Sequence, residues 1–416
     1  MKAYPGETVV LKGDWSISFQ GANWWTLEGL IFDQPQRQYI QLGLHQALGH
    51  DRTVAAEHIT IRNCEFKNGT SAVIPVHYAN DVLIENNYFH HVRPGTPFYD
   101  AQGNQIGWEL NAIDVRYMAD DIVIRNNRFE EMGSDGVQLG SQSYREGSHI
   151  GSVSIINNEF WVNRPYQGIL GNVSENAIDI KKVSGPILVS GNTIHGFRPT
   201  TPQQDASGAD GDGLTIHLDA QNVIVERNLF YDNTMHITVT KNSQNIVIRN
   251  NILRDSYPYD HPSAGTGILV YESTGVQILH NTFFNNQNHI KGYSEVVTTG
   301  VLKNNVFWRG GFYVPSPGGA WDWDADYNAW SEITGGVPAP LRGSHDVLNV
   351  DLQLDQELKP TENSPLIDAG TDVGVTDDFA RNARSDGTPD MGAREWRWSN
   401  LMVHAVHIVP SHIQPK

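Results

Sequence analysis

The sequence predicts an all-β fold, a single-stranded right-handed parallel β-helix in which each coil of short strands stacks on the next. A recurring phrase carries this prediction: alternating apolar residues, then Asn, one further residue and a large apolar residue, as in 82–89 (VLIENNYF). Composition agrees, because Gly (39), Trp (11) and Tyr (15) are plentiful. Long stretches rich in Ala, Leu, Glu and Lys are missing, which disfavours helical bundles.

The spacing of the phrase sets the size of one coil. The shortest gaps between its large apolar anchors, such as Phe66 to Phe89, are 23 residues. Helix-pair repeats are longer, and a β-propeller blade needs nearly twice as many residues. We therefore interpret the longer gaps as loops inserted at one turn of the coil, at 93–108, 141–151 and 198–211. Loops clustered on one side commonly form the walls of a binding cleft.

An asparagine stands two residues before nearly every anchor. The column consists of Asn87, Asn127, Asn158, Asn192, Asn228, Asn251, Asn281, Asn305 and Asn328. Asn tolerates the left-handed turn conformation, and its amide can bond to the coils above and below. The column predicts a structural asparagine ladder. Cys64 interrupts the column at an interior position, so we expect it to be a small buried side chain.

The repeat predicts a β-helix domain at 1–331, followed by a tail at 332–416 that packs on the coils or caps them. The strings 364–370 (SPLIDAG) and 390–395 (DMGARE) resemble the closing segment of secreted bacterial β-helix repeat proteins. That resemblance implies export. The start, 1–6, has no hydrophobic signal core, and we expect an extracellular or periplasmic protein whose leader has been removed.

Charge and hydropathy restrict the partners. The formal net charge of −18 disfavours binding to nucleic acid and to anionic membranes. No apolar run approaches the roughly 18 residues needed to span a bilayer. Heptads and hydrophobic seams are also missing, so a monomer is expected.

Each coil has a second strand, ahead of the Asn phrase, whose outward residues are chemically distinctive. Alternation sends Ile, Val and Leu inward. The outward columns contain Asp114, Gln138, Asp179 and Thr215 beside His77, Arg116, Lys181, His217 and Tyr271. Adjacent coils are about 4.8 Å apart, so the pair Asp179 and Lys181 should neighbour His217. The columns predict a polysaccharide-binding face, and a solvated sheet face with paired charges is the alternative.

Clustered acidic residues near these strands suggest calcium, which takes six to eight oxygen ligands. The candidate ligands are Glu175, Asp135 and Asp212. The sequence around these acidic residues lacks an EF-hand pattern. Their alternative role is to stabilise turns.

The strings 174–181 (SENAIDIK) and 210–217 (DGDGLTIH) resemble the calcium-dependent family 9 pectate lyases, within the β-helix polysaccharide lyases. The resemblance extends over 8–331. It implies β-elimination on a uronate-containing polysaccharide, with Lys181 as the base that removes the proton alpha to the carboxyl group. Such a lysine must be neutral, so desolvation or a cation such as Arg116 must lower its pKa, whereas Asp179 opposes this. Arg198, His217 and Tyr271 are then candidate substrate binders or proton donors.

Other functions remain open on the same fold. An inverting glycoside hydrolase would need two carboxyl groups about 6.5–9.5 Å apart, which two of Asp114, Asp135, Asp179 and Asp212 could supply. The hallmark strings of polygalacturonases and of alginate epimerases are absent. A non-catalytic adhesin or tailspike-like module is the third possibility, with sugar faces stacked on tryptophans. The candidates for that stacking are Trp24, Trp25, Trp108, Trp161 and Trp308.

Overall fold

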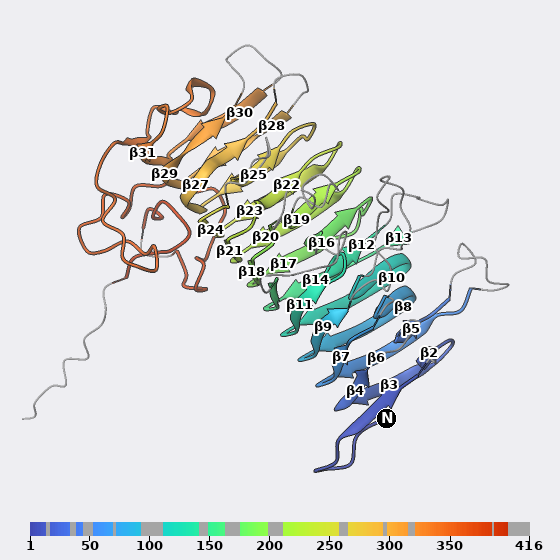
Figure 1. Ribbon diagram of the computed structural model, residues 1–416. Coiled ribbons are helices and arrows are strands. Elements are labelled where there is room, and N and C mark those ends of the chain that lie inside the picture. Colours follow the sequence, from blue (N-terminus) through green and yellow to red (C-terminus); the bar gives the residue numbers. More distant parts are fainter. Residues whose placement is uncertain are drawn as a thin grey trace, which may run out of the picture.

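The structure is a computed structural model, and it forms a parallel β-helix whose coils stack from the N-terminal to the C-terminal end (Figure 1). The described residues are 1–13, 17–33, 39–44, 53–69, 72–92, 111–140, 149–162, 175–198, 211–257, 265–293, 298–314, 321–384 and 387–397. Within them, 32 strands join one continuous hydrogen-bonded system, and the one helical element is a 3-10 turn, Ala339–Leu341. The predicted all-β fold is confirmed. None of the described helical structure is long and apolar enough to cross a membrane.

Each coil contributes strands to three sheets, and we take the sheet whose strand precedes the asparagine phrase of a coil as the first. The first sheet comprises β2 (Ile17–Phe19), β5 (Ile40–Leu42), the starts of β8 (Ile74–Glu85) and β10 (Ile113–Arg125), β12 (Val137–Leu139), β16 (Asn176–Lys181), β19 (Asp212–His217), β22 (Met235–Val239), β25 (Thr266–Val270) and the end of β27 (Thr282–Lys291). The second comprises β3 (Asn23–Glu28), β6 (Ala56–Arg62), the ends of β8 and β10, β13 (His149–Ile150), β14 (Val153–Ile156), β17 (Ile187–Ser190), β20 (Gln221–Glu226), β23 (Gln244–Arg249), β26 (Val276–Leu279), β28 (Thr298–Lys303) and β30 (Trp321–Asp326).

The third sheet follows the asparagine of each coil. It comprises β1 (Val9–Lys12), β4 (Leu30–Asp33), β7 (Glu65–Lys67), β9 (Tyr88–Val92), β11 (Arg128–Met132), β15 (Glu159–Trp161), β18 (Thr193–His195), β21 (Leu229–Tyr231), β24 (Ile252–Arg254), the start of β27, β29 (Val306–Tyr313), β31 (Ala329–Ile333) and β32 (Val347–Leu348). Strands of neighbouring coils pair in parallel, for example β16 with β19 and β20 with β23. The pairing of β31 with β32 carries the sheet beyond residue 331.

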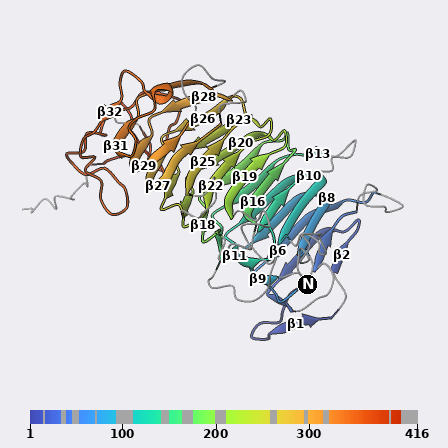
Figure 2. The same cartoon turned by 45° about the horizontal axis from the view of Figure 1, so that its top comes forward.

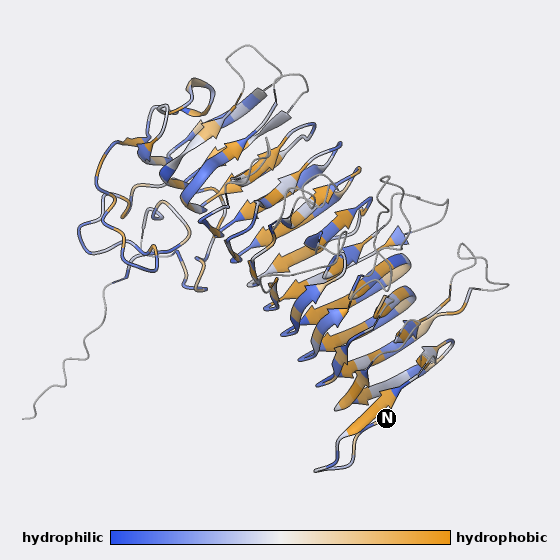
Figure 3. Cartoon of the chain, in the orientation of Figure 1, coloured by the Kyte–Doolittle hydropathy of each residue, from blue (hydrophilic) through white to orange (hydrophobic). Residues whose placement is uncertain are grey.

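Alternation along each strand builds the interior. In β14 the side chains alternate between buried and partly exposed, and the same alternation of apolar and polar residues recurs along the coils in Figure 3. The aromatic anchors stack on one another: the ring centroids of Phe66 and Phe89 are 4.8 Å apart, and those of Phe129 and Phe160 are 4.4 Å apart. The core is therefore a continuous column of apolar side chains, in which Cys64 is also buried.

The asparagine ladder is present, but its geometry differs from the prediction in one respect. Oδ1 of Asn251 accepts hydrogen bonds from the backbone N and from Nδ2 of Asn228, and Asn251 donates in turn to Asn281. The ladder asparagines do not adopt the left-handed conformation. The residue before each one does, such as Asn250 with φ 55°, because the chain must bend sharply there to aim the next amide inward.

The ladder ends at a carboxylate. The backbone N of Asn328, the last asparagine, donates to Asp346 Oδ1 at 2.9 Å. Asp346 Oδ2 also accepts hydrogen bonds from Trp330 Nε1 and from the backbone N of Gly343. Burial raises the pKa of Asp346, and these donors counteract part of that rise.

The C-terminal segment lies against the last coils, as Figure 2 shows for the orange and red part of the chain. Leu358 and Ala393 pack on Ile252 of β24, so this segment covers part of the third sheet. Arg384 anchors it: its guanidinium pairs with Glu395 and donates to Asn250 Oδ1 at 3.1 Å. The side chains of Arg384 and Glu395 are each 1% exposed.

Replacing Arg384 with alanine is expected to release the C-terminal segment, because it leaves the Glu395 carboxylate buried without its cation. Breaking a buried ion pair from one side costs about 3–5 kcal/mol. Limited proteolysis with mass spectrometry should show faster cleavage within 334–397. The control is Arg397→Ala, which removes a bond to the Ala383 carbonyl at the surface and should leave the pattern unchanged. Equal cleavage of both variants would contradict this anchoring role.

Candidate functional site

Three of the predicted catalytic side chains form one cluster on the outer face of the first sheet. Register places Asp179 of β16 beside Thr215 of β19, and Lys181 beside His217. Lys181 Nζ lies 2.6 Å from Asp179 Oδ2, and His217 Nε2 lies 2.9 Å from Asp179 Oδ1. The Lys181 and Asp179 side chains are 4% and 2% exposed, whereas His217 is 12% exposed. The buried carboxylate of Asp179 thus contacts two basic side chains.

A second ion pair occupies the same outward columns. Asp114, Gln138 and Asp179 are consecutive register partners on β10, β12 and β16. Arg116 Nε lies 2.6 Å from Asp114 Oδ1, and Arg116 Nη2 donates to Gln138 Oε1 at 3.0 Å. Burial alone would raise the pKa of Asp114, but the charge of Arg116 and the nearby His77 outweigh it, so this pKa lies below its usual value. Gln138 lies between the two ion pairs in the register of the sheet.

The lowered pKa of Asp114 predicts a pH-dependent contribution to stability. Folding favours the ionised form, so the contribution is complete above the unfolded-state pKa of about 3.9 and is lost as the pH falls through the folded value. Asp114→Asn should therefore reduce the free energy of unfolding at pH 7, and its difference from the unmodified protein should shrink below about pH 4. Urea titrations from pH 3 to 7 measure this. The control is Asp121→Asn, an exposed position on the same strand. A difference independent of pH would refute the assignment.

Each of the predicted metal ligands accepts a hydrogen bond from a neutral group of the protein. Asp135 Oδ1 accepts a hydrogen bond from Asn176, and Asp212 Oδ2 accepts hydroxyl donors from Thr215 and Thr238. Glu175 accepts a hydrogen bond from Ser134 Oγ at 3.2 Å. Across the described ranges, no three His, Cys, Asp or Glu side chains meet in an arrangement that could hold a metal ion. Calcium binding by these residues stays a prediction.

The fold and the first-sheet geometry agree with a known family. The family described as the right handed beta helix region matches residues 16–178 and, in a second overlapping match, 117–308. The two matches together span more than half of the chain. This protein belongs to the right-handed β-helix family.

Solved structures of other right-handed β-helix proteins resemble this one at low sequence identity. XylC in complex with xylose is 13% identical, with 86% of this chain and 67% of that chain covered and a TM-score of 0.55. Pectate lyase Pel9A is 14% identical, with 89% and 88% covered and a TM-score of 0.50. At such identities the likeness shows the fold alone. No curated protein matches the sequence.

The remaining residues predicted to bind substrate in this right-handed β-helix lie in different surroundings, and not all of them belong to the first sheet. His77 belongs to the neighbouring ion pair, with Nε2 3.8 Å from Asp114 Oδ2. Tyr271 packs edge-on against Tyr293, with centroids 5.4 Å apart, and burial raises the pKa of its hydroxyl. Arg198 lies beyond the third-sheet strand β18, where it pairs with Asp232 and covers the ring of Tyr257. The structure therefore does not place Arg198 in the first-sheet columns.

Sequence reasoning missed Lys291. Register pairs it with Leu269, so it continues the column of Asp179, Thr215 and Thr238. It is 4% exposed, and its Nζ lies 5.0 Å from the ring centroid of Tyr313 and 5.5 Å from that of Tyr293. The signal was available in 288–291 (NHIK), which follows the anchor Phe283 at the same spacing as 235–238 (MHIT) follows the anchor Phe230.

Part of the predicted site lies outside the described residues. This applies to Trp108 and to most of the predicted loops 93–108, 141–151 and 198–211. Trp24 and Trp25 are described and lie near the N-terminal end, 77% and 46% exposed.

Proposed function

We propose that this protein is an extracellular enzyme that cleaves a uronate-containing polysaccharide by β-elimination, with its chemistry at Lys181, Asp179 and His217. The observation that carries the proposal is the buried cluster in which both basic side chains contact the Asp179 carboxylate. The cluster lies on the outer face of adjacent coils, where a chain laid across the sheet can reach it. A pectate lyase, Pel9A, is among the proteins that share the fold.

The reaction requires a base and a proton donor. The base takes the proton from the ring carbon next to the uronate carboxylate, and a carbon–carbon double bond forms as the bond to the glycosidic oxygen breaks. The departing oxygen then takes a proton. We assign the base to Lys181 and the proton donor to His217, which is the more exposed of the two. Arg116, whose side chain is 24% exposed, is placed to attract the uronate carboxylate.

Asp179 makes this division of roles possible. A buried carboxylate needs a positive partner, and either basic side chain can provide it. When His217 is protonated, it balances the charge of Asp179, and Lys181 can be neutral without leaving the carboxylate uncompensated. Proton transfer from the sugar to Lys181 and from His217 to the leaving oxygen then leaves Lys181 protonated and His217 neutral. The charge of the cluster is the same before and after cleavage.

Two of the four candidate carboxylates, Asp114 and Asp179, favour elimination over hydrolysis. An inverting hydrolase needs one protonated carboxylic acid as the proton donor. Asp114 is held in its ionised form by Arg116, and Asp179 is paired with Lys181, so neither is set up to donate a proton. Calcium, if bound, would neutralise the uronate carboxylate. The roles above do not depend on it.

The test is incubation of the protein with a panel of uronate polysaccharides, with added calcium and with a chelator. We expect ultraviolet absorbance from the unsaturated uronate to rise with at least one polymer. New reducing ends without that absorbance would instead indicate hydrolysis, and binding without any product would indicate an adhesin-like module. Loss of the signal in the chelator arm alone would show that calcium is required.

A further inference from the structure

A column of rings and guanidinium groups follows the outer face of the third sheet. Six register partners on consecutive coils form this aromatic column: Trp161, His195, Tyr231, Arg254, Phe284 and Trp308. All six are partly exposed, although the third sheet is otherwise a scaffold element. With coils about 4.8 Å apart, the column extends over about 24 Å.

Neighbouring members of the aromatic column hold one another in place. His195 stacks on Tyr231 with centroids 4.5 Å apart, and the Arg254 guanidinium lies 5.1 Å from the centre of the Tyr231 ring. The centroids of Phe284 and Trp308 are 4.7 Å apart. Phe284 and Trp308 also pack against the cluster of Ile252, Leu358 and Ala393, so part of each ring is covered, and the exposed remainder of such rigid rings can stack against the apolar faces of a ligand.

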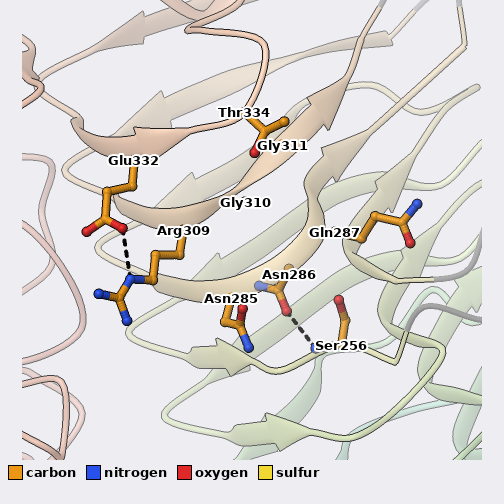
Figure 4. Close-up of a pocket in the computed structure, with 9 residues that line it drawn as sticks. All are labelled: Ser256, Asn285, Asn286, Gln287, Arg309, Gly310, Gly311, Glu332 and Thr334. Carbon is orange, nitrogen blue, oxygen red and sulfur yellow. Dashed lines mark hydrogen bonds and ion pairs between the residues drawn. The ribbon is translucent and has the colours of Figure 1, made fainter.

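A polar hollow of about 550 Å³ opens beside the C-terminal end of the column (Figure 4). Its lining includes Ser256, Asn285, Gln287, Arg309, Gly310 and Thr334. Gly310 allows two coils to approach closely beside the hollow, because a Cβ there would lie 2.2 Å from the Asn286 carbonyl oxygen. The volume falls in the roughly 300–1,000 Å³ range of small-molecule sites. A second hollow of about 400 Å³, lined in part by Trp308, adjoins it at Glu332.

One buried group in the hollow lacks a partner. Ser256 is 5% exposed, and its Oγ has no hydrogen-bond partner among the described residues, although its backbone N bonds to Asn286 Oδ1. A buried hydroxyl left unpaired costs about 1–3 kcal/mol. A ligand hydroxyl in the hollow would satisfy it.

The charge of the lining selects against an acidic ligand. Arg309 Nε lies 2.9 Å from Glu332 Oε2, so the one cation of the lining is balanced within it. The amides of Asn285 and Gln287 both donate and accept hydrogen bonds, as sugar hydroxyls do. A carboxylate would meet no net positive charge.

From these observations we propose that the hollow and the aromatic column bind a neutral oligosaccharide, at a site separate from the Lys181 cluster. One sugar occupies the hollow and bonds to Ser256, and the sugars that follow stack along Trp308 and Phe284. The first-sheet register places Asp179 four coils from Lys291 of β27, or about 19 Å along the axis. The site is therefore independent of the elimination chemistry proposed above.

Isothermal titration calorimetry tests the proposal with three neutral hexasaccharides, xylohexaose, cellohexaose and mannohexaose, beside hexagalacturonate. We expect at least one neutral probe to bind, and Ser256→Ala and Trp308→Ala each to weaken it tenfold or more. Ser256→Ala removes only an unpaired hydroxyl, so it should not disturb folding. The control, Trp24→Ala, removes an exposed ring that stacks on His58 near the N-terminal end and should bind normally.

Uronate elimination should be unchanged in Ser256→Ala, and Lys181→Arg should retain neutral binding. These two results separate the further site from the proposed catalytic one. Failure of all three neutral probes would overturn the proposal. So would equal binding by Ser256→Ala and the unmodified protein, or loss of hexagalacturonate binding in that variant.

Discussion

Lys181→Arg is expected to lower kcat for uronate elimination by about 10³-fold, within the range for loss of a general base. Arginine keeps a cation beside Asp179, so the buried carboxylate stays paired and the fold is preserved. A guanidinium remains protonated and cannot accept the proton from the sugar. The initial rate of ultraviolet absorbance increase, at saturating polysaccharide, measures kcat directly.

A second variant and a control separate chemistry from packing. Lys181→Met has nearly the same length without an amine, and we expect it to be equally inactive. Lys12→Arg, an exposed position paired with Asp33 in the first coil, should keep full activity. If Lys181→Arg retains more than a tenth of kcat while its unfolding midpoint is unchanged, Lys181 is not the base. The Asp179–His217 pair would then be the next candidate.

Asn228→Ala is expected to reduce the free energy of unfolding by about 3–6 kcal/mol, the largest stability effect among these predictions. The side chain is fully buried, and its Nδ2 donates to the Val189 carbonyl at 2.9 Å. Its Oδ1 accepts from the backbone N and from Nδ2 of Asn192. Alanine removes the partners of the Val189 carbonyl and of the Asn192 backbone N in the preceding coil, each at a cost of about 1–3 kcal/mol, and takes one of the two donors from Asn251 Oδ1 in the following coil.

Urea unfolding followed by circular dichroism measures this effect. Asn23→Ala, an exposed position on β3, serves as the control and should change stability by less than about 0.5 kcal/mol. In a stacked solenoid the ends can unfold before the middle, so the midpoint should be recorded with a probe of the central coils. A loss below about 1 kcal/mol for Asn228→Ala would mean that water replaces the amide.

The fold could be predicted because its determinants are local and periodic. The Asn phrase repeats with the coil, and the alternation around Asp179 fixes which side chains face outward. It was harder to predict which residue adopts the left-handed conformation at the bend beside each ladder asparagine. The ladder asparagine is buried and hydrogen-bonded, so the residue before it adopts the left-handed conformation. That residue is Asn250 in one coil, but Arg227 or His280 in others.

The candidate site could be predicted only where register alone determines proximity. Asp179, Lys181 and His217 were placed together because each belongs to a strand aligned by the same anchor. Arg198 was not excluded from the site, because its position after β18 depends on a turn that periodicity does not describe. Ser256 and its hollow carry no sequence signal, since the lining comes from separate coils, at Ser256, Gly310 and Thr334.

The hydrogen bonds of the asparagine ladder also have a common direction along the axis of the β-helix. Along the ladder, each Oδ1 accepts hydrogen bonds from the backbone N and from Nδ2 of the asparagine one coil earlier, so these bonds share one direction along the axis. Aligned hydrogen bonds of this kind polarise one another. The array ends at the Asp346 carboxylate, whose Oδ1 accepts a hydrogen bond from the backbone N of Asn328. The ladder thus ends at a negatively charged side chain, Asp346, and not at another asparagine.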